Sequence, residues 1–271
     1  MTQTTRRTFL AAGAAAFTHA VIARAAYAQA APATAGPVDP ALIDDLVAAN
    51  RILVDQGVVD GYGHVSVRHP ADPQRYLMSR SIAPELVTAA DIMEYDLDST
   101  AVDARGRTSY LERFIHGEIY RARPDVKAIV HNHSPSVIPF GVSTAPLRPL
   151  YHMSAFLGGG VPVFDIKAAA GGATDMLVRN AALGRALATT LGARPVALMR
   201  GHGAVVVGSN IQLTVFRSVY TEMNARLQAQ AMALGSPVTY LDDEEARLAG
   251  ASVGGTVVRP WELWRKKALA R

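Results

Sequence analysis

The spacing of hydrophobic and polar residues along the chain predicts helices and strands that alternate. Apolar residues return every three or four positions in four segments, which is the period of an amphipathic helix. Other short segments alternate apolar and polar residues, or are apolar throughout, which is typical of strands. We expect helices at 42–53, 111–121, 175–191 and 213–234. We expect strands at 65–67, 75–78, 92–97, 126–131, 161–164, 196–199 and 204–207.

Several of the expected strands are joined by short turns rather than by helices. Ala71-Asp72-Pro73 separates the first two strands, and Arg200-Gly201-His202-Gly203 separates the last two. Links this short join antiparallel neighbours, whereas parallel strands need a longer crossover. The pattern therefore predicts an α/β fold, a single-domain three-layer α/β/α sandwich with a central mixed, largely antiparallel sheet. This domain is expected to occupy residues 41–271, without an internal repeat.

Residues 1–30 depart from this pattern and are typical of an export signal. Thr5-Arg6-Arg7-Thr8-Phe9-Leu10 is a twin-arginine pattern, and an alanine-rich stretch leads to Ala28-Gln29-Ala30, a small-x-small cleavage site. Arg24 interrupts the apolar stretch, which is too short to span a membrane. We expect export to the periplasm by the twin-arginine route, followed by a linker at 31–40. The alternative is an uncleaved alanine-rich tail.

Composition limits the chemistry. The 271 residues are 49% hydrophobic and 18% charged, which is ordinary for a protein with an ample core. There is no cysteine, so disulfides, thiolate metal sites and a cysteine nucleophile are excluded. Removing the three arginines of residues 1–30 lowers the formal charge from +4 to +1. We expect no nucleic-acid partner, because such a partner requires a basic face, and no membrane partner.

Three histidines and one glutamate are the candidate metal ligands. His131 and His133 are separated by one residue, so in an extended strand both side chains point to the same face. His202 lies between two glycines at a strand end, where a side chain can project into a cleft. Glu112 opens a helix and His116 follows one turn later on the same face. Each residue alone also suits a structural role, such as a turn histidine or a first-turn glutamate.

Taken in order, these residues and their neighbours resemble the class II aldolase/adducin family. The matching landmarks are Gly63-His64-Val65-Ser66-Val67-Arg68, Glu112-x-x-x-His116 with Tyr120-x-x-Arg123-Pro124-Asp125, Ala128-Ile129-Val130-His131-Asn132-His133-Ser134, and Gly201-His202-Gly203 followed by Val207-Gly208. They extend from about residue 42 to residue 240, nearly the whole of the expected domain. Four landmarks in the right order are jointly specific.

The resemblance implies a single α/β/α domain with one divalent metal ion per subunit. His131, His133 and His202 would take the places of the family's three metal histidines. Glu112 would be the fourth ligand, which then moves away to act as an acid or base. Zinc is the favoured ion, with manganese, cobalt or iron as alternatives. His116 and Asn132 would support the ligands from behind, and the resemblance also implies a homotetramer with sites between subunits.

Departures from the family's sugar-phosphate members change the expected substrate. His64 stands where those members have asparagine, Ser79-Arg80 replaces a Thr-Gly or Ser-Gly pair, and Tyr110 replaces a serine. The small and amide residues cradle a phosphate, so their loss argues against a phosphate monoester. Arg80 can grip a planar carboxylate through two hydrogen bonds, and His64 can donate to the same group. We therefore expect His64, Ser79, Arg80 and Tyr110 to bind a small carboxylate substrate, unless Arg80 simply faces solvent.

A further departure concerns proton transfer. The family's sugar aldolases have a proton-donating tyrosine where this chain has His152, next to Tyr151. A histidine donates protons nearer neutral pH than a tyrosine does. Loss of CO2 has no aldehyde oxygen to protonate and needs a proton on carbon instead. The change favours a decarboxylase, or an aldolase of different substrate, with His152 or Tyr151 as the proton donor.

We therefore expect a metal-dependent carbon–carbon lyase, either a decarboxylase or an aldolase. Its substrate would be a non-phosphorylated hydroxy-keto acid or phenolic carboxylate, cleaved through a metal-stabilised enolate. Glu112 and His152 would be the catalytic acid/base groups. Two alternatives remain. Three neutral histidines can also hold Fe(II) for an oxygenase, and a non-catalytic adducin-like scaffold would need none of these residues.

Overall fold

A seven-stranded sheet forms the centre of the molecule in the computed structural model, which describes residues 34–270. Its strands are β1 (His64–Arg68), β2 (Arg75–Ser79), β3 (Ile92–Asp96), β4 (Ala128–Asn132), β5 (Val163–Phe164), β6 (Val196–Met199) and β7 (Gly203–Gly208). The strand order is β3-β2-β1-β4-β7-β6-β5. All neighbours are antiparallel except β5 and β6. The expected mixed, largely antiparallel sheet is therefore confirmed.

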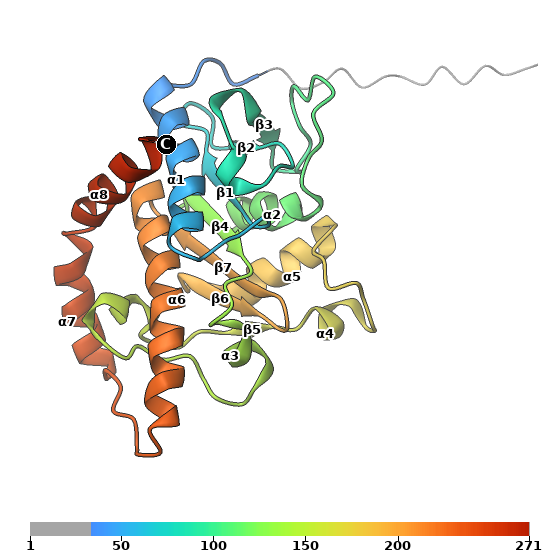
Figure 1. Cartoon of the computed structure of the whole chain (residues 1–271). Coiled ribbons are helices and arrows are strands. Elements are labelled where there is room, and N and C mark those ends of the chain that lie inside the picture. The colour runs from blue at the N-terminus through green and yellow to red at the C-terminus, as the bar shows by residue number, and fades with distance from the viewer. Residues whose placement is uncertain (1–33, 271) are drawn as a thin grey trace, which may run out of the picture. The chain divides into compact units, whose positions relative to one another are not determined.

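Helices cover both faces of the sheet (Figure 1). They are α1 (Pro40–Asp55), α2 (Phe114–Ala122), α3 (Ile138–Val142), α4 (Ile166–Ala170), α5 (Ala181–Leu191), α6 (Ile211–Ala233), α7 (Asp243–Gly254) and α8 (Val258–Leu269). Short 3-10 helices occur at η1 (Pro84–Leu86), η2 (Ala89–Asp91), η3 (Leu111–Arg113) and η4 (His152–Leu157). α1 begins as its sequence dictates, because Asp39 caps the Ala41 N–H at 2.9 Å and Pro40 occupies the first turn.

The alternation of side chains along the strands produces two cores. In β4, Val130 points into a core shared with α1, α6 and α8, while Ile129 points into a core shared with α2 and α5. The result is the three-layer sandwich. His131 lies on the same face as Ile129, and β1 places His64 directly opposite His131. The candidate site therefore belongs to the α2/α5 side, at the end of β4.

The structure corrects one expected helix. Residues 175–191 were expected to be helical throughout, but α5 begins only at Ala181, with Asn180 as its cap (φ −150°) accepting from the Leu183 N–H. The preceding segment is irregular, and Met176 has a left-handed backbone (φ +70°). Its main-chain groups bind side chains of the candidate site, which a helix would prevent.

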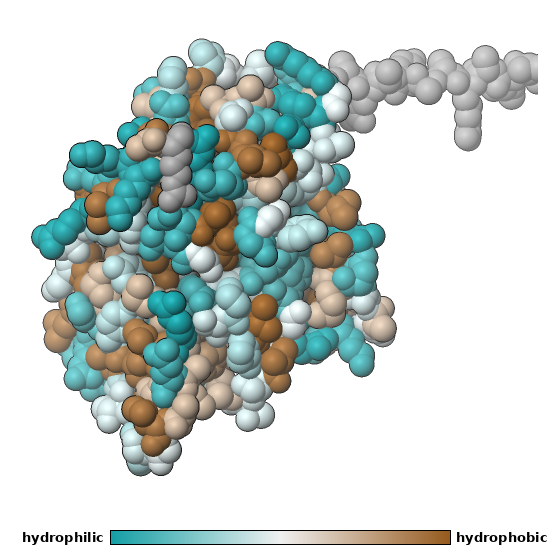
Figure 2. All heavy atoms as spheres, in the orientation of Figure 1, coloured by the Kyte–Doolittle hydropathy of each residue, from teal (hydrophilic) through white to brown (hydrophobic). Residues whose placement is uncertain are grey.

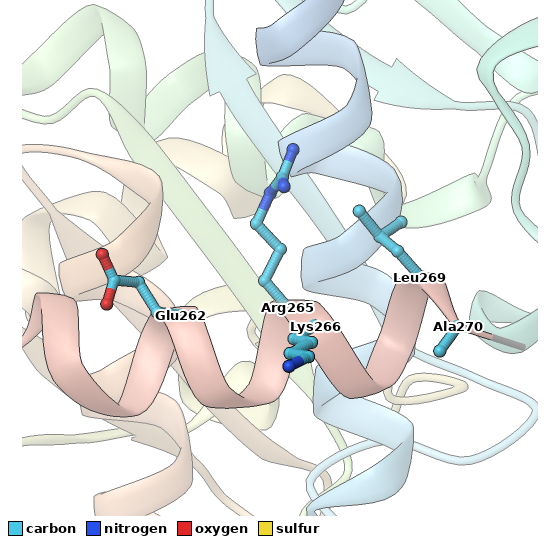
Figure 3. Close-up of a pocket in the computed structure, with 5 residues that line it drawn as sticks. All are labelled: Glu262, Arg265, Lys266, Leu269 and Ala270. Carbon is cyan, nitrogen blue, oxygen red and sulfur yellow. The ribbon is translucent and has the colours of Figure 1, made fainter.

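The C-terminal helices were not expected from the sequence. α8 packs against α1, and Arg265 reaches from α8 toward α1 to pair with Asp45 at 2.6 Å (Figure 3). Lys266 and Lys267, which follow Arg265 directly in the sequence, are exposed. The shallow hollow beside them on α8 is lined by Glu262, Arg265 and Lys266, and Glu262 belongs to no group of convergent metal ligands among the described residues.

The surface of the described residues carries both hydrophobic and polar side chains (Figure 2). Hydrophobic residues are interspersed with polar ones over the face that Figure 2 shows. Within residues 34–270, no helix has both the length and the apolar character needed to cross a membrane. The expected export signal, residues 1–30, lies outside the described residues.

Candidate metal centre

Four side chains from distant parts of the sequence converge at the end of β4. Glu112 comes from η3, and His131 is the last residue but one of strand β4. His133 follows directly after β4, and His202 lies in the turn between β6 and β7. One nitrogen or oxygen atom from each lies within 4.8 Å of those from the others. The structure thus brings together all four residues that the sequence singled out as metal ligands.

Main-chain carbonyls fix the orientation of two imidazoles. His131 Nδ1 lies 3.2 Å from the Ala204 oxygen, and His202 Nδ1 lies 2.9 Å from the Met176 oxygen. A carbonyl oxygen only accepts, so each Nδ1 must carry the hydrogen. In the neutral ring, Nε2 then has a free lone pair directed at the centre of the cluster. Such an arrangement is common behind metal-binding histidines.

Glu112 connects the imidazoles to the loop before α5. Its Oε2 lies 3.3 Å from the Nε2 atoms of both His131 and His202. Its Oε1 accepts the Val178 N–H at 2.9 Å. Burial opposes ionisation of the carboxyl, but the two histidines outweigh it and hold the pKa of Glu112 well below its usual value. Glu112 is therefore an anion at the centre of the cluster.

The cluster fits a cation. His131 Nε2 is fully buried and has no hydrogen-bond partner, and His133 Nε2 lies only 2.9 Å from His202 Nε2. Burial alone would lower the pKa of His202, but the neighbouring Glu112 carboxylate raises this pKa above its usual value. The centre of the cluster therefore favours a positive charge. Burial lowers the pKa of His133 to about 4, so that ring is neutral. Three imidazole nitrogens and one carboxylate form a donor set that suits a divalent ion such as zinc.

A glycine allows the close approach of the strands that carry these ligands. A Cβ atom on Gly203 would lie 2.0 Å from the Asn132 carbonyl oxygen, far inside van der Waals contact. Any side chain at this position would push β7 away from β4. His202 precedes Gly203 and His133 follows Asn132, so the separation of these ligands depends on the missing side chain.

The cluster forms one wall of a cavity of about 520 Å³. Its lining is mostly apolar or small apart from the ligands and His64. The lining residues are Gly61, Tyr62, Gly63, His64, Ser81, Ile82, Ala83, Tyr110, Leu111, Glu112, His131, His133 and Leu177. This composition suits a small ring-shaped or branched molecule with few charges.

A buried hydrogen-bonded row extends from the cavity into the core. His64 Nδ1 lies 2.7 Å from His116 Nε2, and His116 Nδ1 lies 2.6 Å from Ser66 Oγ. Ser66 Oγ lies 2.8 Å from the Tyr120 hydroxyl, and the guanidinium of Arg68 covers the Tyr120 ring. His116 is thus buried behind His64 rather than exposed. The sequence contains a signal for both hydroxyl residues: Ser66 shares a strand face with His64, and Tyr120 shares a helix face with His116.

Two of the four expected substrate-binding residues line the cavity, and two do not. His64 and Tyr110 line the cavity, and their rings are 4.5 Å apart. Ser79 is buried behind Tyr110, with its Oγ 3.1 Å from the Tyr110 hydroxyl. Arg80 does not line the cavity; its Nε binds Asp91 at 2.6 Å. The expected carboxylate clamp is therefore not formed, because Arg80 already has an anionic partner.

His152, the expected proton donor, does not line the cavity beside the four ligands. His152 is exposed in η4 and lines a separate hollow beside α7 and α8, so it does not reach the four ligands. The Tyr151 ring lies 5.9 Å from that of His152 and is likewise absent from the cavity lining. Asn132 is buried, and its Oδ1 accepts the Ser134 N–H at 3.1 Å. It therefore shapes the turn next to His133.

One residue that sequence reasoning missed holds the loop after His133. Glu222, buried in α6, accepts hydrogen bonds from Ser134 Oγ, Ser136 Oγ and the Ser136 N–H, the last at 3.0 Å. These bonds fix the chain directly after His133. Glu222 is 86 residues from Ser136, and no local pattern announces the contact.

Comparison with known proteins agrees with the landmarks. Residues 44–229 match the family model described as Class II Aldolase and Adducin N-terminal domain. The chain is 37% identical over 240 residues to Decarboxylase tropJ of Talaromyces stipitatus, covering 80% of this chain and 90% of that protein. It is 30% identical over 212 residues to 3,4-dihydroxyphthalate decarboxylase of Rhodococcus jostii, covering 73% and 83%.

The fold is likewise similar to a solved structure. L-fuculose 1-phosphate aldolase from Glaciozyma antarctica superposes with a TM-score of 0.69 at 23% sequence identity, covering 86% of this chain and 94% of that one. At this identity the similarity concerns the fold alone.

Proposed function

The chain belongs to the class II aldolase and adducin family, and we propose that it is a metal-dependent decarboxylase of a hydroxyaromatic carboxylic acid. The observation that carries the proposal is the cavity itself. Three of the four convergent ligands, Glu112, His131 and His133, line one wall, and the rest of the lining contains no lysine or arginine among the described residues. A decarboxylase needs to hold a carboxylate without neutralising it too strongly.

The shape and polarity of the lining support an aromatic substrate. Tyr62, Ile82, Leu111 and Leu177 contribute apolar and aromatic surface to the lining. Such surface binds the faces of a ring. A phosphate group would instead require cationic side chains or a cradle of main-chain N–H groups. The cavity therefore supports a non-phosphorylated substrate, although Arg80 does not bind it.

The two relatives point to the same reaction. Both are named decarboxylases, and the name of one specifies a dihydroxylated aromatic dicarboxylate. A hydroxyl group next to the carboxylate supplies the pair of oxygens that a divalent ion chelates well. We propose this vicinal arrangement as the substrate class, with aldol cleavage of a hydroxy-keto acid as the alternative.

The reaction replaces a carboxylate by a hydrogen: ArCOO⁻ and H⁺ give ArH and CO2. The C–C bond breaks, its electron pair stays on the ring carbon, and a proton must be delivered there. A divalent ion held by Glu112, His131, His133 and His202 would act as a Lewis acid that withdraws electron density from the substrate oxygens. Glu112 lines the cavity, so its carboxylate would be placed to accept the phenolic proton and to return it. The apolar lining excludes water from the reacting carbon.

The test is release of CO2 by metal-loaded protein from a panel of hydroxybenzoates. We expect turnover of acids with a hydroxyl next to the carboxylate, and none of isomers that lack it. Release of pyruvate or an aldehyde from hydroxy-keto acids would favour the aldolase. Oxygen uptake that depends on iron would favour the oxygenase. Full metal binding without any turnover would favour the scaffold.

We also propose zinc as the bound ion, a homotetramer as the assembly, and twin-arginine export to the periplasm. The three-nitrogen, one-oxygen donor set supports zinc. Tyr62 and Leu111 remain largely exposed at the cavity, as they would if a second subunit covered them. Metal analysis, light scattering and fractionation of cells that express the whole chain test the three proposals separately.

A further inference from the structure

The buried row behind His64 has a definite hydrogen-bond direction. Tyr120 is fully buried, and among the described residues Ser66 Oγ is the one recorded partner of its hydroxyl group. If the Tyr120 hydroxyl donates to Ser66, the Ser66 hydrogen has one other recorded partner among the described residues, His116 Nδ1, and is donated to it. His116 then carries its hydrogen on Nε2 and donates to His64 Nδ1. His64 is left with its own hydrogen on Nε2.

The opposite direction is unfavourable. If His64 donated to His116 and His116 to Ser66, the contact between Ser66 and Tyr120 could use only one of their two hydroxyl hydrogens. The other hydroxyl hydrogen would then be buried without an acceptor among the described residues, which a folded protein avoids. In the first direction His64 Nδ1 and His116 Nδ1 each accept a hydrogen bond, so each ring carries a single hydrogen and is neutral.

We propose that His116, Ser66 and Tyr120 are positioning residues that hold His64 in the Nε2–H tautomer, so that His64 donates a hydrogen bond to the substrate carboxylate. His64 lines the cavity, and its Nε2 is bound to no other described residue. With no lysine or arginine in the lining, this N–H is a directional donor that does not neutralise the carboxylate. The identity of the ligand rests on the proposed function; the tautomer does not.

The same tautomer explains why His64 is not a metal ligand. Its ring lies 5.1 Å from that of His131, close to the four ligands. His131 has the opposite tautomer, set by the Ala204 carbonyl, and therefore presents a lone pair from Nε2. A nitrogen that carries a hydrogen cannot coordinate a metal ion. The buried row thus separates two adjacent histidines into one ligand and one donor.

The test compares two variants of His116 in zinc-loaded, full-length protein. In His116→Gln the amide can accept from Ser66 and donate to His64, which reproduces the direction of the row. In His116→Leu both bonds are lost while the volume is similar. Nitrogen-15 NMR of labelled histidines distinguishes the two tautomers, and the signals of His64 are assigned by their loss in His64→Asn.

We expect the Nε2–H tautomer of His64 in the wild type and in His116→Gln, and a mixture of tautomers in His116→Leu. Binding of 2,3-dihydroxybenzoate and of catechol, measured by calorimetry, tests the donor. The preference for the carboxylate should fall about tenfold in His116→Leu, as for loss of one hydrogen bond to a charged group, and persist in His116→Gln.

An Nδ1–H tautomer of His64 in the wild type would overturn the proposal, even if His116→Leu does not fold. An unchanged preference in His116→Leu would overturn the role of the donor. Absence of decarboxylation with the expected tautomer and binding would instead count against the proposed function alone.

Discussion

Removal of one imidazole should abolish most of the stability that a divalent ion adds. His133→Ala leaves three of the four convergent donors. At a metal concentration of about 100 times Kd, a native-state ligand contributes about 2.7 kcal/mol. For a domain of this size, each kcal/mol changes Tm by roughly 2–4 °C. Addition of zinc to metal-free wild-type protein should therefore raise Tm by about 5–11 °C.

The variant should respond far less at the same metal concentration. Loss of a ligand should weaken binding by at least about 100-fold, the upper end for loss of a supporting partner. Zinc is then near its Kd and contributes about 0.4 kcal/mol, or about 1 °C. Differential scanning fluorimetry with and without zinc measures both shifts. His152→Ala, an exposed histidine outside the cluster, is the matched control. Equal shifts in wild type and His133→Ala would refute the site.

Other perturbations test the site and its surroundings. Glu112→Gln should keep the fold and lower kcat by about 10²–10⁴-fold, measured by CO2 release; nearly wild-type turnover would remove Glu112 from acid/base catalysis. Gly203→Ala would bring a Cβ to 2.0 Å from the Asn132 oxygen, so urea unfolding should show a loss of about 1–3 kcal/mol. Arg80→Ala should change KM less than threefold, because Arg80 binds Asp91 outside the cavity; a tenfold rise would return it to the substrate site. His116 has a pKa of about 3 in the fold, against about 6.5 when unfolded. Below pH 6.5 the unfolded chain therefore binds an extra proton at this site, so His116 contributes a loss of about 1.4 kcal/mol per pH unit in chelator-treated protein. Urea unfolding at several pH values should show this contribution removed in His116→Gln, while those of His64 and His133 remain.

The sequence by itself determined the elements and most of the metal ligands. Strand alternation is a local property, so β1, β2, β4, β6 and β7 and their short turns could be predicted from it. His131 and His133 share a strand end, and the glycines around His202 mark a turn that only small residues allow. These signals lie within a few residues of the groups they describe. The order of the landmarks then indicated the family.

Tertiary structure alone decided how the cavity is completed. Residues 175–180 have a helical pattern, yet their backbone binds Glu112 and His202 instead. A buried side chain left without a hydrogen bond costs more free energy than one additional helical turn gains. Arg80 was expected in the cavity, but Asp91 is nearer in space. Periodicity reports which face of an element is buried. Which charged or polar group meets which partner across that face depends on elements far apart in the chain.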